Sequence, residues 1–228
     1  MSSFSVDMKI KVLDHGYVRL VDSMGSDTSV VNAARVSYNG KAGDNPKGDQ
    51  KLINYLWKNK HTTPFEAVTM TFEVKAPIFV LRQWHRHRTW SYNELSARYK
   101  ELPEEYYVPE ESKITEQSTD NKQMRTETQH PHAKVIQDLM DYQNAKAFKL
   151  YRSMLADGCP RELARTILPL ATYSHMFTTV NLLNLMKFCT LRSHEHAQHE
   201  IRVYSDAMVE LVKTIAPVCM KAWSKENT

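Results

Sequence analysis

Residues 67–77 read Ala-Val-Thr-Met-Thr-Phe-Glu-Val-Lys-Ala-Pro, and this stretch decides the expected fold. Its apolar side chains alternate with polar ones and lie at Val68, Met70, Phe72 and Val74. Because successive side chains of a strand point to opposite faces, the alternation predicts a strand over 67–74 with one buried face. Pro77 follows directly and is tolerated in the first turn of a helix, so a helix is expected from Ile78 to about His85.

The segment before this strand carries shorter signals. Residues 8–22 alternate as two short strands around Asp14-His15-Gly16, which predicts a hairpin. A short helix is expected over 29–36 and a glycine-rich loop over 40–48. The loop ends where Asp49 is placed to cap a helix over 50–60.

The segment after residue 103 turns polar as far as residue 132, which predicts a long surface excursion or a partly disordered segment. Helical patterns then dominate, over 133–155, 160–167, 181–191 and 196–216. Further strands are expected near Arg98 and Phe177. These elements predict an α+β fold, a mixed sheet flanked by helices, with a C-terminal half that is mainly helical. Since no linker divides the chain, we expect one domain over 1–228.

The composition is that of a soluble globular protein, with 42% hydrophobic and 25% charged residues. No window approaches the run of about 18 apolar residues that a membrane helix needs. The N-terminus lacks the basic start and apolar middle of a secretory signal, so a cytoplasmic protein without membrane partners is expected. The net charge of +4 does not by itself indicate a nucleic-acid binder.

The glycines and cysteines exclude several kinds of site. With six glycines and no Gly-x-Gly, neither a dinucleotide fingerprint nor a phosphate loop can be written. Cys159, Cys189 and Cys219 are an odd number spaced thirty residues apart, so they form neither a disulfide framework nor a Cys-x-x-Cys metal site. We expect them to be small buried hydrophobic residues.

Arginines cluster directly after the predicted 78–85 helix, at positions 82, 86, 88 and 98. Arginine binds phosphate through two parallel hydrogen bonds, and serine hydroxyls and loop N–H groups complete such a cradle, so an anionic ligand is favoured over a solvated basic loop. Glu94 can orient these arginines or accept hydrogen bonds from a ligand. An alternative is a single-stranded nucleic-acid binding module over 82–99, with Trp84, Trp90, Tyr92 and Tyr99 as stacking platforms.

Residues 86–99 also fill every fixed position of the signature Arg-His-Arg-x-x-Ser-x-Asn-Glu-x-Ser-x-Arg-Tyr. In this the chain closely resembles the flavin-dependent thymidylate synthase family. The resemblance continues in family order through blocks at 33–37, 61–66, 164–173 and 191–202, and it covers roughly residues 33–204.

The resemblance implies a reaction and a set of contacts. In that family reduced FAD passes a hydride to the pyrimidine of dUMP, methylenetetrahydrofolate gives the one-carbon unit, and NADPH reduces the flavin. The implied FAD contacts are Ser37, Thr63, Glu66, Arg86, His87, Arg88, Asn93, Glu94, Asn181, Leu183 and Lys187. The implied dUMP contacts are Gln83, Trp84, His85, Arg86, Glu94, Leu95, Ser96, Ala97, Arg98, Arg165 and Arg192.

Several of these positions have more specific implied roles. Ser96 and the N–H groups after it would hold the dUMP phosphate, with help from Arg98 and Arg165. Leu183 and Lys187 stand where many family members carry arginine and asparagine. The family is homotetrameric, with active sites shared between subunits, and the same arrangement is expected here.

Arg192 matches the arginine that the family places against the uracil ring, and it is the expected catalytic residue. Loss of the N3 proton of uracil creates an anion, and a fixed guanidinium lowers the free energy of that anion. The alternative for a single helical arginine is a surface salt bridge. Ser96 has no motif that positions a general base for it, so no covalent protein catalyst is expected.

A zinc site is the rival reading of His194, His196 and His199. The zinc-protease pattern places the second histidine four residues after the first, but position 198 is Gln. His194 and His199 are five apart, which turns them about 140° away from each other on a helix. No metal site is therefore predicted.

Overall fold

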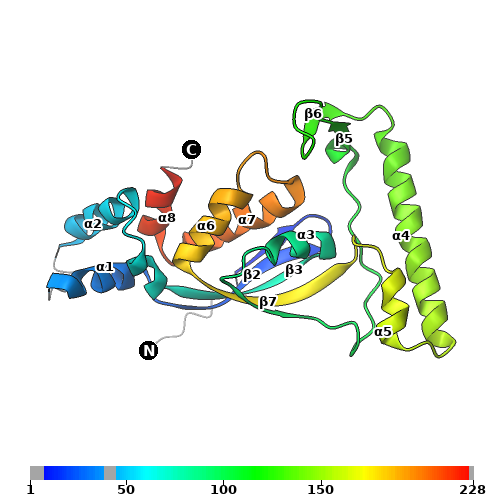
Figure 1. Cartoon of the computed structure of the whole chain (residues 1–228), viewed down its shortest axis with the longest axis horizontal. Coiled ribbons are helices and arrows are strands. Elements are labelled where there is room, and N and C mark those ends of the chain that lie inside the picture. The colour runs from blue at the N-terminus through cyan, green and yellow to red at the C-terminus, as the bar shows by residue number, and fades with distance from the viewer. Residues whose placement is uncertain (1–7, 39–44, 226–228) are drawn as a thin grey trace.

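The computed structural model of the chain describes residues 8–38 and 45–225 and contains one main sheet with helices around it (Figure 1). The sheet runs in the order β1-β2-β3-β7-β4, and its strands are β1 (Lys9–Val12), β2 (Gly16–Met24), β3 (Thr69–Pro77), β7 (Tyr173–Asn181) and β4 (Ser91–Glu94). The expected α+β class is confirmed. The sheet expected to be mixed is antiparallel in every described strand pair.

The helices fall into three groups along the sheet (Figure 1). One face is covered by α3 (Ile78–Trp84), α6 (Leu182–Arg192) and α7 (His199–Val212). One end carries α1 (Asp27–Arg35), α2 (Pro46–Lys58) and α8 (Pro217–Ser224). The other end carries α4 (Ala133–Ala156), α5 (Arg161–Ala164) and the small hairpin of β5 (Thr115–Gln117) and β6 (Arg125–Gln129). Short 3-10 helices are η1 (Val36–Tyr38), η2 (Thr63–Ala67), η3 (Glu111–Lys113) and η4 (Arg165–Ile167).

The predicted strand is the centre of the core. Val68, Met70, Phe72 and Val74 have no exposed surface, and they pack under α6 and α7. Full burial of such a side chain contributes roughly 1.5–3 kcal/mol. The alternation therefore predicted the strand and its buried face, although the strand runs over 69–77 and not over 67–74.

The predicted hairpin at the start of the chain is confirmed, with Val12 paired to Gly16. A Cβ atom at Gly16 would overlap the hydroxyl of Tyr204, which donates to the carbonyl oxygen of Lys75 at 2.7 Å. Only glycine lets α7 approach the sheet this closely.

Several predicted boundaries are wrong. The strand expected near Arg98 lies at Ser91–Glu94, because pairing with β7, for example Asn93 with Phe177, decides where it runs. Asn45, not Asp49, caps α2, and it accepts from the Gly48 N–H at 2.9 Å. Asp49 instead contacts Arg35. Most of the loop expected over 40–48 lies outside the described residues.

The C-terminal helices also differ from expectation. The helix expected to begin at His196 begins at His199, and the helix expected over 160–167 is broken into α5 and η4. A last helix, α8, was not predicted, although Pro217 at its start is a normal helix-opening residue.

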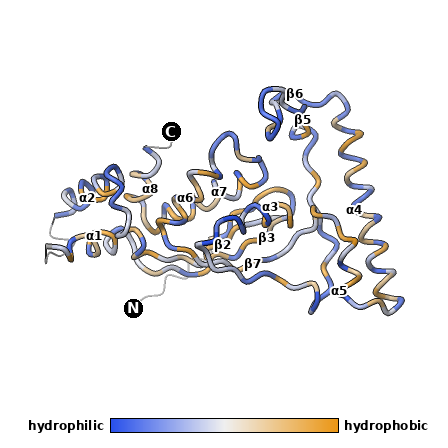
Figure 2. Tube along the Cα trace, viewed as in Figure 1, coloured by the Kyte–Doolittle hydropathy of each residue, from blue (hydrophilic) through white to orange (hydrophobic). Residues whose placement is uncertain are grey.

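The polar excursion over 103–132 is folded, since it contains η3 and the β5–β6 hairpin, a hydrophilic region in Figure 2. A second, smaller core of Phe148, Tyr151 and Ala164 joins α4 to α5. No helix in the described part of the chain combines the length and the apolar content needed to cross a membrane.

Candidate functional site

The arginine-rich loop after α3 is fixed by aromatic side chains. The Tyr92 hydroxyl reaches the carbonyl oxygens of Trp84 at 3.0 Å and His87 at 2.8 Å, and so closes the loop. The Trp84 ring lies 4.9 Å from that of Phe188 on α6, in a stacked arrangement. The loop backbone is thus anchored in the core. Arg86 and Arg88 remain exposed on it, with no ion pair to another residue of the described ranges.

Arg192, at the end of α6, reaches back to this loop. Its Nε donates to His87 Nε2 at 3.0 Å, and its Nη2 donates to the carbonyl oxygen of Gln83 at 3.0 Å. The side chain is half-buried, and burial lowers the pKa of its guanidinium. Its Nη1 has no hydrogen-bond partner within the described part of the chain. A partly desolvated cation with one free edge suits a ligand that carries or develops negative charge.

His87 is held as a neutral imidazole. Burial, and then the charge of Arg192, lower its pKa to about 4. Since Nε2 accepts the hydrogen bond from Arg192, the proton of the neutral ring is on Nδ1. The Arg192 contact therefore sets the tautomer of His87 and adds to burial in keeping the ring neutral.

Glu94 lies at the end of β4, among groups different from those expected. Its Oε1 accepts from the Ser174 hydroxyl at 2.7 Å, and its Oε2 lies 3.8 Å from His85 Nε2. The expectation that Glu94 orients the arginines is not met, because no arginine contacts it in the described ranges. Its neighbours are instead a hydroxyl on β7 and an imidazole at the end of α3.

The turn after β4 holds two of the predicted phosphate-binding residues, Ser96 and Arg98. The Leu95 N–H donates to the His175 carbonyl oxygen at 2.8 Å, which ties the turn to β7. Ser96 Oγ accepts from the Arg98 N–H at 3.3 Å. The Arg98 side chain lies 3.2 Å from Glu162 of α5, three residues before Arg165. Ala97 is buried, so its side chain faces away from any ligand in solvent.

Most of the other predicted cofactor residues lie around η2 and the start of α6. Thr63 and Glu66 are exposed on η2. Asn181 Oδ1 caps α6 by accepting from the Asn184 N–H at 2.9 Å, so this side chain already has a structural task. Leu183 is 4% exposed and belongs to the main core, whereas Lys187 one turn later is exposed.

The predicted residues are dispersed over the molecule. Ser37 follows α1 at one end of the sheet, and Arg165 follows α5 at the other (Figure 1). Asn181 and Arg192 stand at opposite ends of α6, which at 1.5 Å per residue is roughly 16 Å long. One chain therefore presents parts of the expected site in several places.

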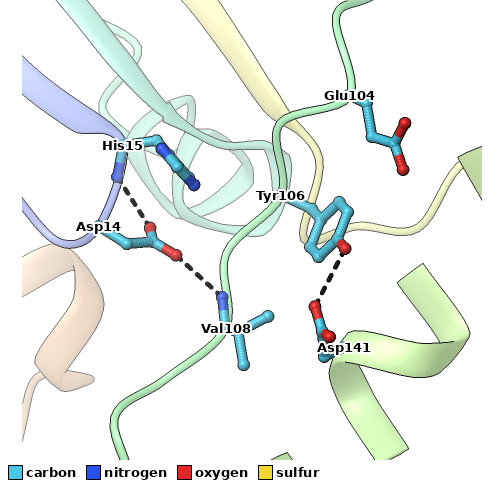
Figure 3. Close-up of a pocket in the computed structure, with 6 residues that line it drawn as sticks. All are labelled: Asp14, His15, Glu104, Tyr106, Val108 and Asp141. Carbon is cyan, nitrogen blue, oxygen red and sulfur yellow. Dashed lines mark hydrogen bonds between the residues drawn. The ribbon is translucent and has the colours of Figure 1, made fainter. Parts of the chain in front are cut away.

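Two cavities of the structure are lined by none of the predicted site residues. The first, of about 420 Å³, is bounded by Asp14, Glu104 and Asp141 together with Tyr106, whose hydroxyl donates to Asp141 at 3.0 Å (Figure 3). Three carboxyl groups make it unsuited to a phosphate. The second, of about 710 Å³, lies between the β5–β6 hairpin and residues 195–202.

Two residues at the edge of the site were given no role from the sequence. Gln198 precedes α7, and its Oε1 accepts from Gln83 Nε2 at 2.5 Å. Glu200, in the first turn of α7, is 2% exposed and pairs with Arg125 at 2.9 Å. The available signal was their position in the 191–202 block, which also contains Arg192.

The rival readings lose their main residues. Trp84 and Trp90 are buried in the core and cannot serve as stacking platforms for nucleic acid. Cys189 and Cys219 are fully buried, as expected, and burial raises the pKa of the Cys189 thiol to about 12, which disfavours a thiolate nucleophile. Cys159 is partly exposed. Within residues 8–38 and 45–225, no group of three or more His, Cys, Asp or Glu side chains is arranged to hold a metal ion.

Comparisons with known proteins give consistent results. The family model described as "Thymidylate synthase complementing protein" matches residues 19–218. A flavin-dependent thymidylate synthase of Ehrlichia ruminantium (strain Gardel) is 46% identical over 214 residues, which cover 93% of this chain and 72% of the relative. A flavin-dependent thymidylate synthase of Treponema denticola is 45% identical over 225 residues, which cover 97% of this chain and 84% of the relative.

A solved structure is similar over nearly its whole length. It is the UMP/dUMP methylase PolB from Streptomyces cacaoi, bound with 5-Br dUMP, and it superimposes with a TM-score of 0.86 at 35% identity. The match covers 95% of this chain and 97% of that one. The same methylase bound with 5-Br UMP matches with a TM-score of 0.85 at 36% identity.

Proposed function

The chain belongs to the family of flavin-dependent thymidylate synthases, and from this membership we propose that it catalyses the reductive methylation of dUMP to dTMP. The observation that supports this activity best is the placement of Arg192. Its guanidinium is half-buried and is held by His87 and by the Gln83 carbonyl oxygen, and among the described residues Nη1 has no hydrogen-bond partner. In this proposal it faces the uracil ring and stabilises the anion formed when N3 loses its proton.

FAD is the proposed cofactor, and the donor set of the chain fits it. Arg86 and Arg88 are exposed guanidinium groups without an ion pair among the described residues, and Lys187 is exposed on α6. Such groups suit the diphosphate of a dinucleotide. When bound, FAD supplies the hydride transfer that no side chain of the protein can supply.

The remaining proposed FAD contacts are mainly polar groups that would orient the cofactor and would not neutralise the charge of its diphosphate. Asn93 is exposed on β4, the edge strand of the sheet, where backbone groups are also free to bond a ligand. The Nδ1–H of neutral His87 is a donor of fixed direction. The other proposed contacts are Ser37, Thr63, Glu66, Glu94 and Asn181, with Leu183 limited to its backbone because its side chain is in the core.

The dUMP phosphate is proposed to bind at the turn after β4. Ser96, Arg98 and Arg165 lie on the turn and the adjacent α5–η4 segment, and Arg165 makes no ion pair with the described residues. His85 and Glu94 would contact the nucleotide from the end of α3 and of β4. The pairing of Arg98 with Glu162 would then be exchanged for pairing with phosphate.

The co-substrates follow from the electron count of the reaction. A methylene carbon carries two electrons fewer than a methyl group. If the one-carbon donor is released as tetrahydrofolate, it does not supply these two electrons, and a hydride from another source is required. Methylenetetrahydrofolate as one-carbon donor and NADPH as reductant satisfy this balance, and we propose that both act here, in the cytoplasm.

We further propose that the protein is a homotetramer whose sites are shared between subunits. The dispersal of the site residues supports this, because residues at opposite ends of one sheet can meet only across subunits. An exposed apolar stripe on α4 supports it as well, formed by Val135, Leu139, Tyr142 and Leu150. Their spacings of four, three and eight residues place them on one face. Sedimentation velocity would measure the oligomer, and a monomer would contradict this part of the proposal.

One assay tests the activity directly. NADPH oxidation and dTMP formation are measured together, with and without dUMP and methylenetetrahydrofolate. We expect a yellow preparation, with flavin absorbance at about 450 nm, that forms dTMP only when both substrates are present. A colourless preparation that takes up no FAD would contradict it.

A further inference from the structure

The Gln83 side chain is held by a residue outside the predicted site. Its Nε2 donates to Gln198 Oε1 at 2.5 Å, across 115 positions of sequence. The Gln83 backbone carbonyl oxygen accepts from Arg192 Nη2 at 3.0 Å. Gln83 is therefore fixed at both its backbone and its side chain, between the catalytic arginine and the start of α7.

Gln198 stands next to a buried carboxylate. Glu200 is two residues further along, is 2% exposed, and accepts from the Tyr107 hydroxyl at 3.1 Å and from Arg125 Nη2 at 2.9 Å. Both contacts are made by Oε1. Its Oε2 is buried, and no residue of the described ranges gives it a hydrogen bond of normal geometry. A buried acceptor left in this state costs free energy, so a nearby donor is favoured to approach it.

The side-chain amide of Gln198 is the donor that we assign to Glu200 Oε2. Its oxygen already accepts from Gln83, which leaves its NH2 group available. Burial opposes ionisation of Glu200, but the charge of Arg125 and hydrogen bonds that include one from Gln198 outweigh it and lower the pKa of the carboxyl. The carboxylate is thus ionised at neutral pH. It accepts only, which makes it a partner for the amide nitrogen of Gln198 and not for its oxygen.

We propose that Gln198 and Glu200 are positioning residues that set which end of the Gln83 amide faces the nucleotide. Glu200, anchored by Arg125 and Tyr107, directs the NH2 group of Gln198 toward itself. The Gln198 oxygen then faces Gln83 and takes its NH2 group. The side-chain oxygen of Gln83, Oε1, which is an acceptor, is then directed toward the nucleotide.

This inference deepens the proposed function and rests on it, because Gln83 is assigned to dUMP through that function. It also gives the polar excursion a role, since Arg125 on β6 anchors the far end of the network. Neither Gln198 nor Glu200 touches the ligand in this arrangement. They act through Gln83.

The test compares Gln198→Ala, Glu200→Gln, Gln83→Ala and the double variant Gln83→Ala/Gln198→Ala with a matched control, Glu195→Gln. Glu195 is exposed in the same loop, and within the described part of the chain its carboxylate pairs only with exposed His196. For each variant the KM for dUMP, kcat, FAD content, thermal midpoint and NADPH oxidation without dUMP are measured. Glu200→Gln keeps the shape of the side chain but allows the amide group of Gln198 to rotate by 180°, exchanging its oxygen and nitrogen. Gln198→Ala avoids any change in the core.

The loss of one hydrogen bond predicts a rise of about three- to tenfold in the KM for dUMP for Gln198→Ala. FAD content, thermal midpoint and dUMP-independent NADPH oxidation should match the control, and the double variant should resemble Gln83→Ala alone. An unchanged KM in Gln198→Ala, or effects that add in the double variant, would overturn the proposal.

Failure of the proposed function is separable from failure of this inference. If the wild-type protein forms no dTMP, the proposed function is wrong. Calorimetric titration then measures the Kd for dUMP of the same variants without turnover. Weaker dUMP binding in Gln198→Ala than in Glu195→Gln would still support the positioning role. Equal binding would end it.

Discussion

Arg192 Nε donates to His87 Nε2 at 3.0 Å, although 105 positions separate the two residues in the sequence. The contact joins the end of α6 to the arginine-rich loop and places the expected catalytic cation beside an expected cofactor contact. Burial lowers the pKa of the imidazole most, and this contact lowers it further, since a protonated ring would put two cations together. The two residues therefore act as one unit.

Replacement of Arg192 by alanine should leave the fold and the flavin content intact and remove most dUMP-dependent turnover. By analogy with the loss of other preorganised electrostatic groups, kcat should fall by about a hundred- to a thousandfold. Measurement of dTMP formation and of absorbance in the flavin band checks both halves. Lys213→Ala, at the exposed residue that follows the last turn of α7, is the charge-matched control, and near-normal turnover in Arg192→Ala would remove Arg192 from the catalytic role.

His87 should make the folded protein less stable as the pH falls. Its pKa is about 4 in the fold and 6.5 in an unfolded chain. Between these values the unfolded chain binds a proton that the folded protein refuses, so the contribution to stability is complete above about pH 6.5 and declines toward pH 4. The thermal midpoint of wild type relative to His87→Gln should drop over this window. Parallel curves for the two proteins would show that His87 is not the group responsible.

Arg98 should act on the phosphate of the nucleotide and not on its base. Arg98→Ala should weaken dUMP binding by about ten- to a hundredfold, the value of a charge-assisted hydrogen bond. Binding of deoxyuridine, which lacks the phosphate, should be nearly unchanged, and titration with both ligands makes the comparison. Glu162→Gln frees Arg98 from its ion pair and should not weaken dUMP binding. Equal losses for the two ligands would place Arg98 elsewhere in the site.

Substitutions of Leu183 and Lys187 should distinguish a residue of the core from a residue that contacts the cofactor, although both lie on α6. Leu183 is in the core, so Leu183→Ala should lower the free energy of unfolding by about 2–5 kcal/mol. Lys187 is exposed, so Lys187→Ala should leave stability unchanged and raise the Kd for FAD by up to about fivefold, the scale of an exposed ion pair. Urea unfolding and fluorescence titration with FAD measure the two quantities. A large loss of stability in Lys187→Ala would contradict this division.

Local sequence patterns predicted those elements whose cause is local. The alternation over 67–74 is set by one buried face, and the helix at 78–85 by a proline and the apolar residues after it. Both elements are present, the strand at 69–77 and the helix at 78–84. The strand at 91–94 was misplaced because its position depends on pairing with β7, which lies more than eighty residues away. The start of α2 was also misplaced, because Asn45 and Asp49 both suit a cap and only the fold shows that Asp49 contacts Arg35.

The sequence by itself determined the family and the fold class and predicted the chemical groups of the expected site, because a signature of fixed residue types is a property of the chain and needs no coordinates. Only the tertiary structure decided which of these groups meet. It brought Arg192 to His87, placed Leu183 in the core, and linked Gln83 to Gln198 and, through it, to Glu200. Such relationships depend on how the sheet and helices pack over long separations in sequence, and no local pattern of side chains carries that information.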